Sequence, residues 1–459
     1  MTFLPRTVLP LLLAGSPLMA ADWPHFLGPK YDLHSTETGL HLDFPESGPK
    51  KLWEVERGRG HAGPVVVGDK LVYLHQVDQN EQIRCLEAAT GREVWEHSYP
   101  VEVDQNFGVV DAPRSSPVID VETGFVYTLG NDGDLICLQI ADGKVVWQLS
   151  VPEVFGTGPF FFGYGSSPLI HGDKLIVNVG AEAACVAAVN KRDGKTIWQA
   201  DHAWHGSYAS PIIATLHGQE KLLVFTGGMV KPPTGGLLCL NPETGAIDSE
   251  FPWRSDNYAS VNGTSPVVCG ENRVFLSEDY GLGGVMVEFD TAFQPQVRWT
   301  SPELGCQFQT PIYHEGTLYG LGGNGGLMLA YDVRSGRMLW NEAFYETKIA
   351  WQGRPISVSL GHAHLVHVDG AFLCLGEDGV LMRLKLNPGG FEVVAKTRLF
   401  YAPETWAPPV ISGGRLFVTQ NELGTKLHCY DLSVAAPEPE GAGPLPNPLR
   451  LGAGRGARK

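Results

Sequence analysis

The chain has 459 residues, of which 18% are charged, and its formal net charge is −16 at pH 7. This acidic balance excludes nucleic acid and anionic membrane surfaces as expected partners. The 56 glycines and 33 prolines are typical of an all-β protein with many turns. Length alone allows two or three domains, but the repeats described below place nearly all of the chain in one.

Residues 1–20 have the pattern of a secretory signal peptide. Arg6 precedes an apolar core at residues 8–13, and Ala20 and Ala21 fit a cleavage site. The core is too short to span a bilayer, and no cysteine follows the cleavage site to carry a lipid anchor. We therefore expect an exported protein, periplasmic or secreted, with no transmembrane segment and no lipid anchor.

A sequence unit of about fifty residues then recurs along the chain. Each copy begins with Ser-Pro or a similar pair and continues through short apolar segments. It then has a Thr-Gly or Asp-Gly turn and ends near a tryptophan such as Trp95, Trp147 or Trp198. Each copy predicts four short antiparallel strands, with proline at a strand start and glycine in a tight turn. One unit cannot bury its apolar faces alone, so the tryptophan is expected to dock each unit against the next.

Eight copies are found, beginning at residues 63, 116, 167, 210, 265, 310, 364 and 407. Trp253 is the expected closing tryptophan of the fourth copy, and Val393 and Val394 stand at that place in the seventh. The eighth copy lacks a fourth strand, whereas residues 51–55 form an unpaired strand before the first copy. We expect this N-terminal strand, around Trp53, to complete the last blade and close the ring, which removes exposed sheet edges.

Over residues 53–433 the repeats resemble the pyrroloquinoline-quinone (PQQ) repeat, through the pattern Ser-Pro-Val-Val followed by Thr-Gly-x-x-x-Trp. Residues 22–29 and 161–168 are similar to segments of the secreted PQQ-like propellers, although Leu27 replaces a usual arginine. The resemblance implies an eight-bladed β-propeller of four-stranded antiparallel blades. Relatives include quinoprotein alcohol dehydrogenases and the lipoprotein scaffold of outer-membrane protein assembly, so the fold leaves the function open.

Four regions are thus predicted. Residues 1–20 are the signal peptide, 21–50 an N-terminal extension, 51–433 the propeller and 434–459 a disordered tail rich in Pro and Gly.

The loop at residues 152–166 contains four phenylalanines. These side chains either fold the loop onto the ring or form a contact patch for a partner.

The cysteines favour small buried positions over disulfides. Cys85, Cys137 and Cys239 share one repeat position, which Ala188 and Ala330 fill in other copies. Equivalent positions in different blades lie too far apart to bridge. A disulfide framework, which exported proteins often use, is the alternative.

Candidate ligand-binding residues lie in the loops that enter the first strand of each copy, because these loops converge around the central channel on one face of a propeller. They are His61, Asp111, Arg114, Tyr164, Tyr208, Asn262, Gln307, Gln309, Arg354 and Trp406. The alternative is ordinary polar surface, loop capping or a protein-contact face. His362 and His364 are weak candidates for a metal site, because alternate strand residues share a face.

The sequence contains no haem-attachment motif, no phosphate loop and no nucleophile elbow. The paired cysteines and the calcium ligands of the dehydrogenases have no recognisable counterpart by motif. We therefore expect a non-catalytic exported propeller that binds a protein partner or a small ligand at its loop face and needs no cofactor. The alternative is a PQQ-dependent alcohol or sugar dehydrogenase with PQQ and Ca²⁺, in which Arg114, Asn262 and Trp406 would contact the cofactor. A carbohydrate-binding or hydrolytic propeller is a third possibility.

Overall fold

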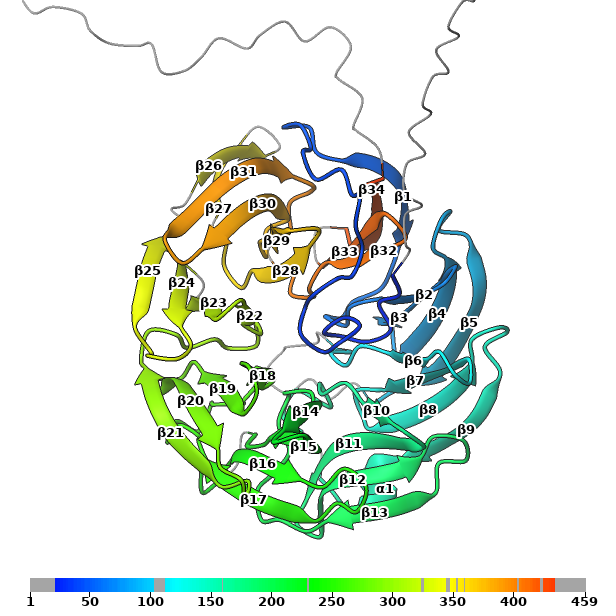
Figure 1. Ribbon diagram of the computed structural model, residues 1–459. Helices are drawn as coiled ribbons and strands as arrows, with labels where there is room; N and C mark the ends of the chain where they lie inside the picture. The colour runs from blue at the N-terminus through cyan, green and yellow to red at the C-terminus, as the bar shows by residue number, and fades with distance from the viewer. Residues whose placement is uncertain are drawn as a thin grey trace, which may run out of the picture.

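Eight four-stranded antiparallel sheets surround a central axis as the blades of a propeller (Figure 1). The computed structural model describes residues 21–102, 112–158, 160–228, 231–322, 326–343, 347–351, 354–358, 360–402, 404–421 and 424–433. The predicted signal peptide and the predicted C-terminal tail lie outside the described residues. In the described part of the chain, no helix has the length and apolar character that a membrane crossing requires.

The first four blades follow one another along the chain. Blade 1 contains β2 (Val65–Val67), β3 (Lys70–Val77), β4 (Asn80–Glu87) and β5 (Glu93–Pro100). Blade 2 contains β6 (Val118–Asp120), β7 (Phe125–Leu129), β8 (Asp134–Gln139) and β9 (Val145–Ser150), followed by the short helix α1 (Val151–Phe155). Blade 3 contains β10 (Leu169–His171), β11 (Lys174–Ala181), β12 (Ala184–Asn190) and β13 (Thr196–Ala200). Blade 4 contains β14 (Ile212–Leu216), β15 (Gln219–Phe225), β16 (Gly236–Leu240) and β17 (Ile247–Pro252).

The remaining blades complete the circle. Blade 5 contains β18 (Val267–Val268), β19 (Arg273–Glu278), β20 (Gly283–Phe289) and β21 (Pro295–Ser301). Blade 6 contains β22 (Ile312–His314), β23 (Thr317–Gly322), β24 (Leu327–Asp332) and β25 (Met338–Ala343), and the hairpin β26 (Thr347–Trp351) and β27 (Arg354–Val358) follows it. Blade 7 contains β28 (His364–Val368), β29 (Ala371–Leu375), β30 (Val380–Asn387) and β31 (Gly390–Arg398). Blade 8 contains β32 (Val410–Ser412), β33 (Arg415–Gln420), β34 (Lys426–Asp431) and β1 (Lys50–Glu56).

The N-terminal strand closes the ring, as predicted. β1 pairs antiparallel with β34, with Trp53 opposite Cys429 and Glu54 opposite His428. The indole Nε1 of Trp53 donates to the carbonyl of Ala88 in blade 1, 3.1 Å away. Blade 8 is therefore built from both ends of the propeller sequence and is also fastened to blade 1.

The recurring tryptophans dock neighbouring blades. Nε1 of Trp95 donates to the carbonyl of Ile140 at 2.8 Å, and Nε1 of Trp147 donates to the carbonyl of Lys191 at 3.1 Å. Each indole also lies flat against a turn glycine of the next blade. At Gly194 a Cβ atom would come within 2.8 Å of the Trp147 ring. The glycine in each Thr-Gly or Asp-Gly turn thus admits the neighbouring indole.

Blades 4 and 7 depart from the predicted pattern. In blade 4, Ser249 and not Trp253 stands opposite Cys239, at the position that tryptophan occupies in most other blades. The Ser249 hydroxyl donates to the carbonyl of Phe293 at 2.5 Å, so it makes the inter-blade hydrogen bond that an indole makes elsewhere. In blade 7 the equivalent residue is Ala395, which follows Val393 and Val394 after a register shift.

The serines of the Ser-Pro pairs form a chain of hydrogen bonds along the channel from blade 1 to blade 5. The backbone N–H of Gly63 donates to Ser116 Oγ (2.9 Å), that of Ser116 to Ser167 Oγ (3.0 Å), and that of Ser167 to Ser210 Oγ (2.9 Å). The backbone N–H of Ser210 in turn donates to Ser265 Oγ at 3.1 Å. Each hydroxyl satisfies a buried backbone donor of the preceding blade, which explains why a small hydroxyl residue precedes the proline.

The cysteines are all buried and free, as the repeat position of three of them predicted. Cys85 and Cys137 each lie opposite the docking tryptophan of their own blade. Burial raises the pKa of Cys185 to about 12, which keeps that thiol protonated. These side chains act as small apolar residues in the blade cores.

The N-terminal extension, residues 21–49, crosses one face of the ring. Asp22 accepts the backbone N–H of Gly68, in the turn between the first two strands of blade 1. The carbonyl of Pro24 accepts a hydrogen bond from blade 2, and the N–H of Ser35 donates to His367 in blade 7. Figure 1 shows this blue segment lying over the middle of the propeller. The extension therefore covers the channel on the face opposite to the loops that enter the first strands.

Candidate functional site

A cavity of about 230 Å³ lies in the middle of the ring, between the loops that enter the first strands. The extension reaches it from the opposite face through Phe26. The other lining residues are His61, Arg114, Phe162, Gly165, Ser167, Tyr208, Ser210, Val261, Gly263, Tyr280, Gln307, Phe308, His364 and Trp406. The cavity thus has a wall of loop residues from most blades and a base from the extension.

One side of the cavity is an aromatic stack. The imidazole of His61 stacks on the indole of Trp406, with ring centroids 4.4 Å apart and planes inclined by 25°. Phe308 lies 5.1 Å from Trp406 and stacks on His362 at 4.7 Å. These rings present flat apolar faces, which favour a flat ligand group.

The opposite side is held by the loop after α1. Nη1 of Arg114 donates to the carbonyl of Phe162 at 2.8 Å, and the guanidinium lies 5.2 Å from the centre of the Phe162 ring. The Tyr208 hydroxyl accepts the N–H of Phe162 at 3.0 Å. Burial raises the pKa of Tyr208 to about 12, so this hydroxyl stays neutral. Among the described lining residues, Arg114 is the one that carries a permanent charge.

A polar network fixes the aromatic side. His362 joins Gln307 through Nε2 (2.9 Å) and Glu377 through Nδ1 (2.7 Å), and the Trp406 indole donates to the same carboxylate at 3.2 Å. Gln307 Nε2 donates to the Tyr280 hydroxyl at 2.8 Å. Burial opposes ionisation of Glu377, but the hydrogen bond from His362 outweighs it and lowers the pKa of the carboxyl. The carboxylate is therefore charged and already engaged by two donors.

His61 carries an unpaired donor. The Asn421 amide donates to Nδ1 of His61 at 2.7 Å, and Arg57 orients that amide by donating to its oxygen at 2.8 Å. Burial, together with Arg114 and Arg57, holds the pKa of His61 well below its usual value. The ring is thus neutral, with its proton on Nε2. This nitrogen is buried and has no hydrogen-bond partner among the described residues.

His364 repeats this feature. It lines the same cavity, is 2% exposed, and its Nε2 is likewise buried without a partner in the described part of the chain. Burial lowers its pKa to about 4, so its ring is neutral as well. Buried polar atoms are nearly always hydrogen-bonded in native proteins. These two unpaired ring nitrogens in one cavity wall are positions to which a water molecule or a ligand can supply the missing partner.

The ten candidate residues that the sequence predicted divide into three groups. His61, Arg114, Tyr208, Gln307 and Trp406 line the cavity together. Three candidates lie outside the lining and support loops instead. The Asn262 amide donates to the Thr226 carbonyl at 2.6 Å, and the Gln309 oxygen accepts two backbone N–H groups. The Tyr164 ring packs on Phe160. Asp111 and the side chain of Arg354 lie outside the described residues.

Several lining residues were not predicted from the sequence. Phe26 belongs to the extension, whose path no repeat defines, and Phe308 lies between Gln307 and Gln309, whose polar side chains made them the candidates. Of the two interpretations of the phenylalanine loop, packing onto the ring is the one that the structure supports, and a contact patch for a partner stays a prediction. Phe155 and Phe160 are buried in the core of blades 2 and 3, whereas Phe162 faces the cavity.

Comparison with known proteins points to one family. The family model described as outer membrane protein assembly factor BamB matches residues 79–342. The assembly factor BamB of Yersinia pestis is 26% identical over 271 residues, which is 55% of this chain and 62% of that protein. The serine/threonine-protein kinase AfsK of Streptomyces griseus is 30% identical over 172 residues, 36% of this chain and 19% of the kinase. The chain thus spans less than two thirds of the length of either curated relative.

Solved structures share the fold at low identity. BamB from Moraxella catarrhalis superposes with a TM-score of 0.56 and 15% identity, covering 83% of this chain and 99% of that one. A europium-containing methanol dehydrogenase has a TM-score of 0.66 and 12% identity, covering 90% and 98%. The quinohemoprotein alcohol dehydrogenase of Comamonas testosteroni has a TM-score of 0.62 and 13% identity, covering 93% and 82%. At these identities the likeness concerns the fold alone.

Proposed function

The chain belongs to the family of the outer membrane protein assembly factor BamB, and from this premise we propose that it is an exported, non-catalytic binding scaffold. Its binding site is the central cavity of the loop face. The observation that carries this proposal is the pair of buried, unpaired ring nitrogens of His61 and His364 in the cavity wall. A relative named for outer membrane protein assembly supports an exported protein and a protein partner.

The lining defines the chemistry of the bound group. Nε2–H of His61 requires an acceptor, and the Arg114 guanidinium attracts negative charge. Trp406 and Phe308 offer flat apolar faces. The cavity therefore suits a flat, mostly apolar group of one or two rings that carries a carboxylate or carbonyl oxygen. Such a group is either a small molecule or a side chain that a protein partner inserts.

The dehydrogenase alternative fits the lining poorly. PQQ is a tricarboxylate, and the Ca²⁺ that accompanies it requires several oxygen ligands, normally with carboxylates among them. Among the described lining residues, Arg114 is the one permanent cation and none is an aspartate or glutamate. The neighbouring Glu377 is already bound by His362 and Trp406. The same lack of a carboxylate pair in the described lining argues against a glycoside hydrolase.

The experiment uses 2-naphthoate, a flat two-ring carboxylate, titrated into the purified protein while tryptophan fluorescence and heat are recorded. We expect one site per chain. Arg114→Gln should weaken binding by roughly 10–100-fold, since hydrogen bonds to charged groups contribute about 1.5–3 kcal/mol. Arg92→Gln is the matched control, because Arg92 pairs with Glu87 on an exposed turn away from the cavity. Equal binding by wild type and Arg114→Gln, or no binding by wild type, would refute the proposed site.

A second experiment separates the scaffold from the enzyme. The protein is incubated with PQQ and Ca²⁺, desalted, and assayed for dye reduction with alcohols. The proposal predicts neither retained quinone absorbance nor dye reduction. Both results together would establish the dehydrogenase alternative.

A further inference from the structure

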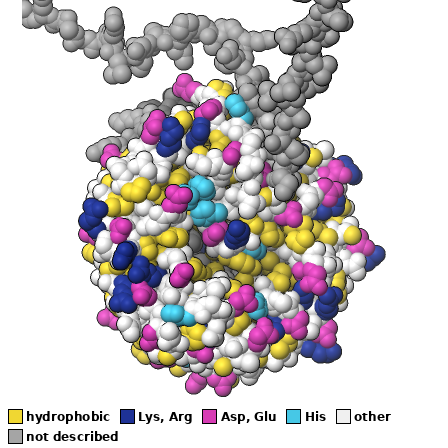
Figure 2. Space-filling view, in the orientation of Figure 1, with side chains coloured by type: hydrophobic (Ala, Val, Ile, Leu, Met, Phe, Trp, Pro, Cys, Tyr) yellow, Lys and Arg dark blue, Asp and Glu magenta, His cyan; other side chains and the backbone are white. Residues whose placement is uncertain are grey.

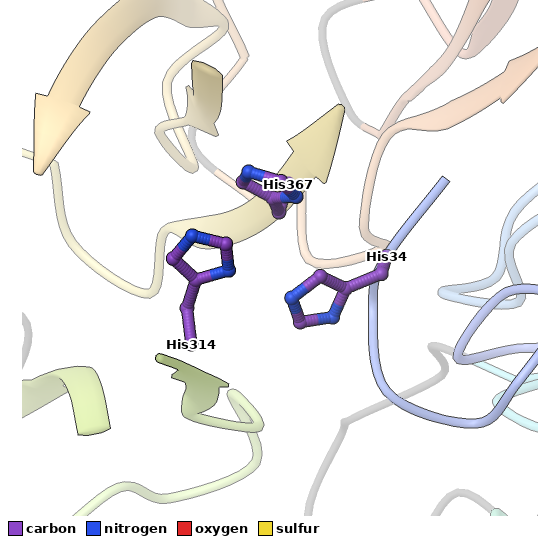
Figure 3. A group of neighbouring side chains, drawn as sticks. All are labelled: His34, His314 and His367. Carbon is purple, nitrogen blue, oxygen red and sulfur yellow. The ribbon is translucent and has the colours of Figure 1, made fainter. Parts of the chain in front are cut away.

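Three histidines from separate segments meet on the face that the extension crosses. His34 lies on the extension, His314 ends β22 in blade 6, and His367 lies on β28 in blade 7 (Figure 3). One ring nitrogen from each lies within 4.8 Å of the other two, and all three side chains are half-buried. Figure 2 shows histidine side chains gathered near the middle of this face. The cluster is separate from the cavity, since His367 lies three residues, or about 10 Å, along β28 from His364.

The backbone holds the extension at this place. The N–H of Ser35 donates to the carbonyl of His367 at 2.8 Å, and the N–H of His367 donates to the carbonyl of Leu33 at 3.0 Å. These two bonds pair the extension with β28 in parallel, so that His34 and His367 lie side by side. The position of the His34 ring is thus fixed by main-chain bonds as well as by its own contacts.

The rings are arranged as metal ligands. Nδ1 of His34 lies 2.8 Å from the carbonyl of Asp32, which can only accept, so this nitrogen carries the proton and Nε2 has the lone pair. An outer hydrogen bond of this kind orients most metal-binding histidines. No hydrogen bond engages the ring nitrogens of His314 or His367 within the described ranges. Their rings face each other with centroids 4.2 Å apart.

Packing is consistent with this role. Phe372 packs edge-on against the His314 and His367 rings and limits their rotation on one side.

We propose that His34, His314 and His367 bind a divalent transition-metal ion such as Zn²⁺. With bonds of about 2.0–2.1 Å, two nitrogen ligands of a tetrahedral ion lie roughly 3.4 Å apart, so modest side-chain rotations bring the three nitrogens into place. The fourth position is left to water or to the exposed carboxylate of Glu315, whose oxygen lies 4.0 Å from Nε2 of His314. The ion fastens the extension to blades 6 and 7 and so holds the segment that bounds the central cavity.

The test is calorimetric titration of Zn²⁺ into the full chain purified without a histidine tag. We expect one ion per chain, and a loss of affinity of at least about tenfold in His34→Gln and in His314→Gln, because each removes one of three ligands. His41→Gln is the matched control, since His41 lies on the same extension outside the cluster. Ca²⁺ should not bind here, because hard cations prefer oxygen ligands.

A spectroscopic measurement on the unaltered protein does not depend on the variants folding. Co²⁺ added in place of Zn²⁺ should give the intense visible absorption of a tetrahedral site, and one equivalent of Zn²⁺ should remove it. Failure of the wild type to bind Zn²⁺, or binding by His34→Gln as tight as by wild type, would overturn the assignment. The 2-naphthoate titration is carried out without added metal, so that it reports binding in the central cavity and is read separately from the Zn²⁺ titration.

Discussion

The joint between blades 2 and 3 offers a test of how the ring is held together. Gly194 and Gly172 are both turn residues of blade 3 with positive φ, +72° and +58°. An added Cβ at Gly194 would lie 2.8 Å from the Trp147 ring, whereas at Gly172 it would meet nothing within 4 Å. Gly194→Ala and Gly172→Ala thus share the backbone strain, and the clash with the docking tryptophan is confined to the first.

The expected magnitudes follow from these contacts. Left-handed backbone costs an alanine about 1–2 kcal/mol, which applies to both variants. At Gly194 the methyl group also displaces Trp147, which strains the packing by about 1–3 kcal/mol and weakens the bond to the Lys191 carbonyl, worth about 1 kcal/mol. We therefore expect Gly194→Ala to lose about 2–4 kcal/mol more unfolding free energy than Gly172→Ala.

The measurement is urea-induced unfolding of the two variants and wild type, followed by tryptophan fluorescence and circular dichroism. The free energies of unfolding can be compared when all three proteins show the same dependence of that free energy on urea concentration. Equal destabilisation of the two variants would refute the view that indole docking onto turn glycines joins the blades.

Two further predictions concern hydrogen bonds inside the ring. Ser249→Ala should lower the unfolding free energy by about 1–3 kcal/mol, because the buried Phe293 carbonyl loses its donor; an unchanged urea midpoint would argue against the serine's docking role. Glu81 is fully buried, accepts from Tyr99, and its pKa is raised by burial to about 7. The folded state therefore holds this proton more tightly than the unfolded chain, and wild-type stability falls as pH rises from about 4.5 through 7. Relative to wild type, Glu81→Gln should gain up to about 3 kcal/mol between pH 5 and 8. Parallel pH profiles of the two proteins would contradict this account.

The sequence predicts the blades because pairing within a blade is local. The spacing of Trp95, Trp147 and Trp198 reflects one strand-turn pattern per unit, and the unpaired strand around Trp53 requires a partner. The docking residue of blade 4 was missed for a physical reason. A search for an indole selects Trp253, whereas the position is defined by pairing with Cys239, and the Ser249 hydroxyl makes the bond.

The sites are less predictable, because they combine segments that no repeat relates. The loops that precede first strands predicted His61, Arg114 and Trp406 together, since propeller geometry alone brings those loops to the channel. Phe26 enters the cavity from the extension, whose path depends on tertiary hydrogen bonds. The histidine cluster likewise depends on the path of the extension. His34 meets the two blade histidines through main-chain pairing, and their sequence spacing matches no known motif.

The most direct measurement of the central claim is a crystal structure of the protein with 2-naphthoate bound. The account predicts the naphthalene ring beside Trp406 and Phe308, with the carboxylate within hydrogen-bonding distance of Arg114 or of Nε2 of His61. A naphthoate bound only outside the central cavity, or a channel filled by the protein's own side chains, would contradict it.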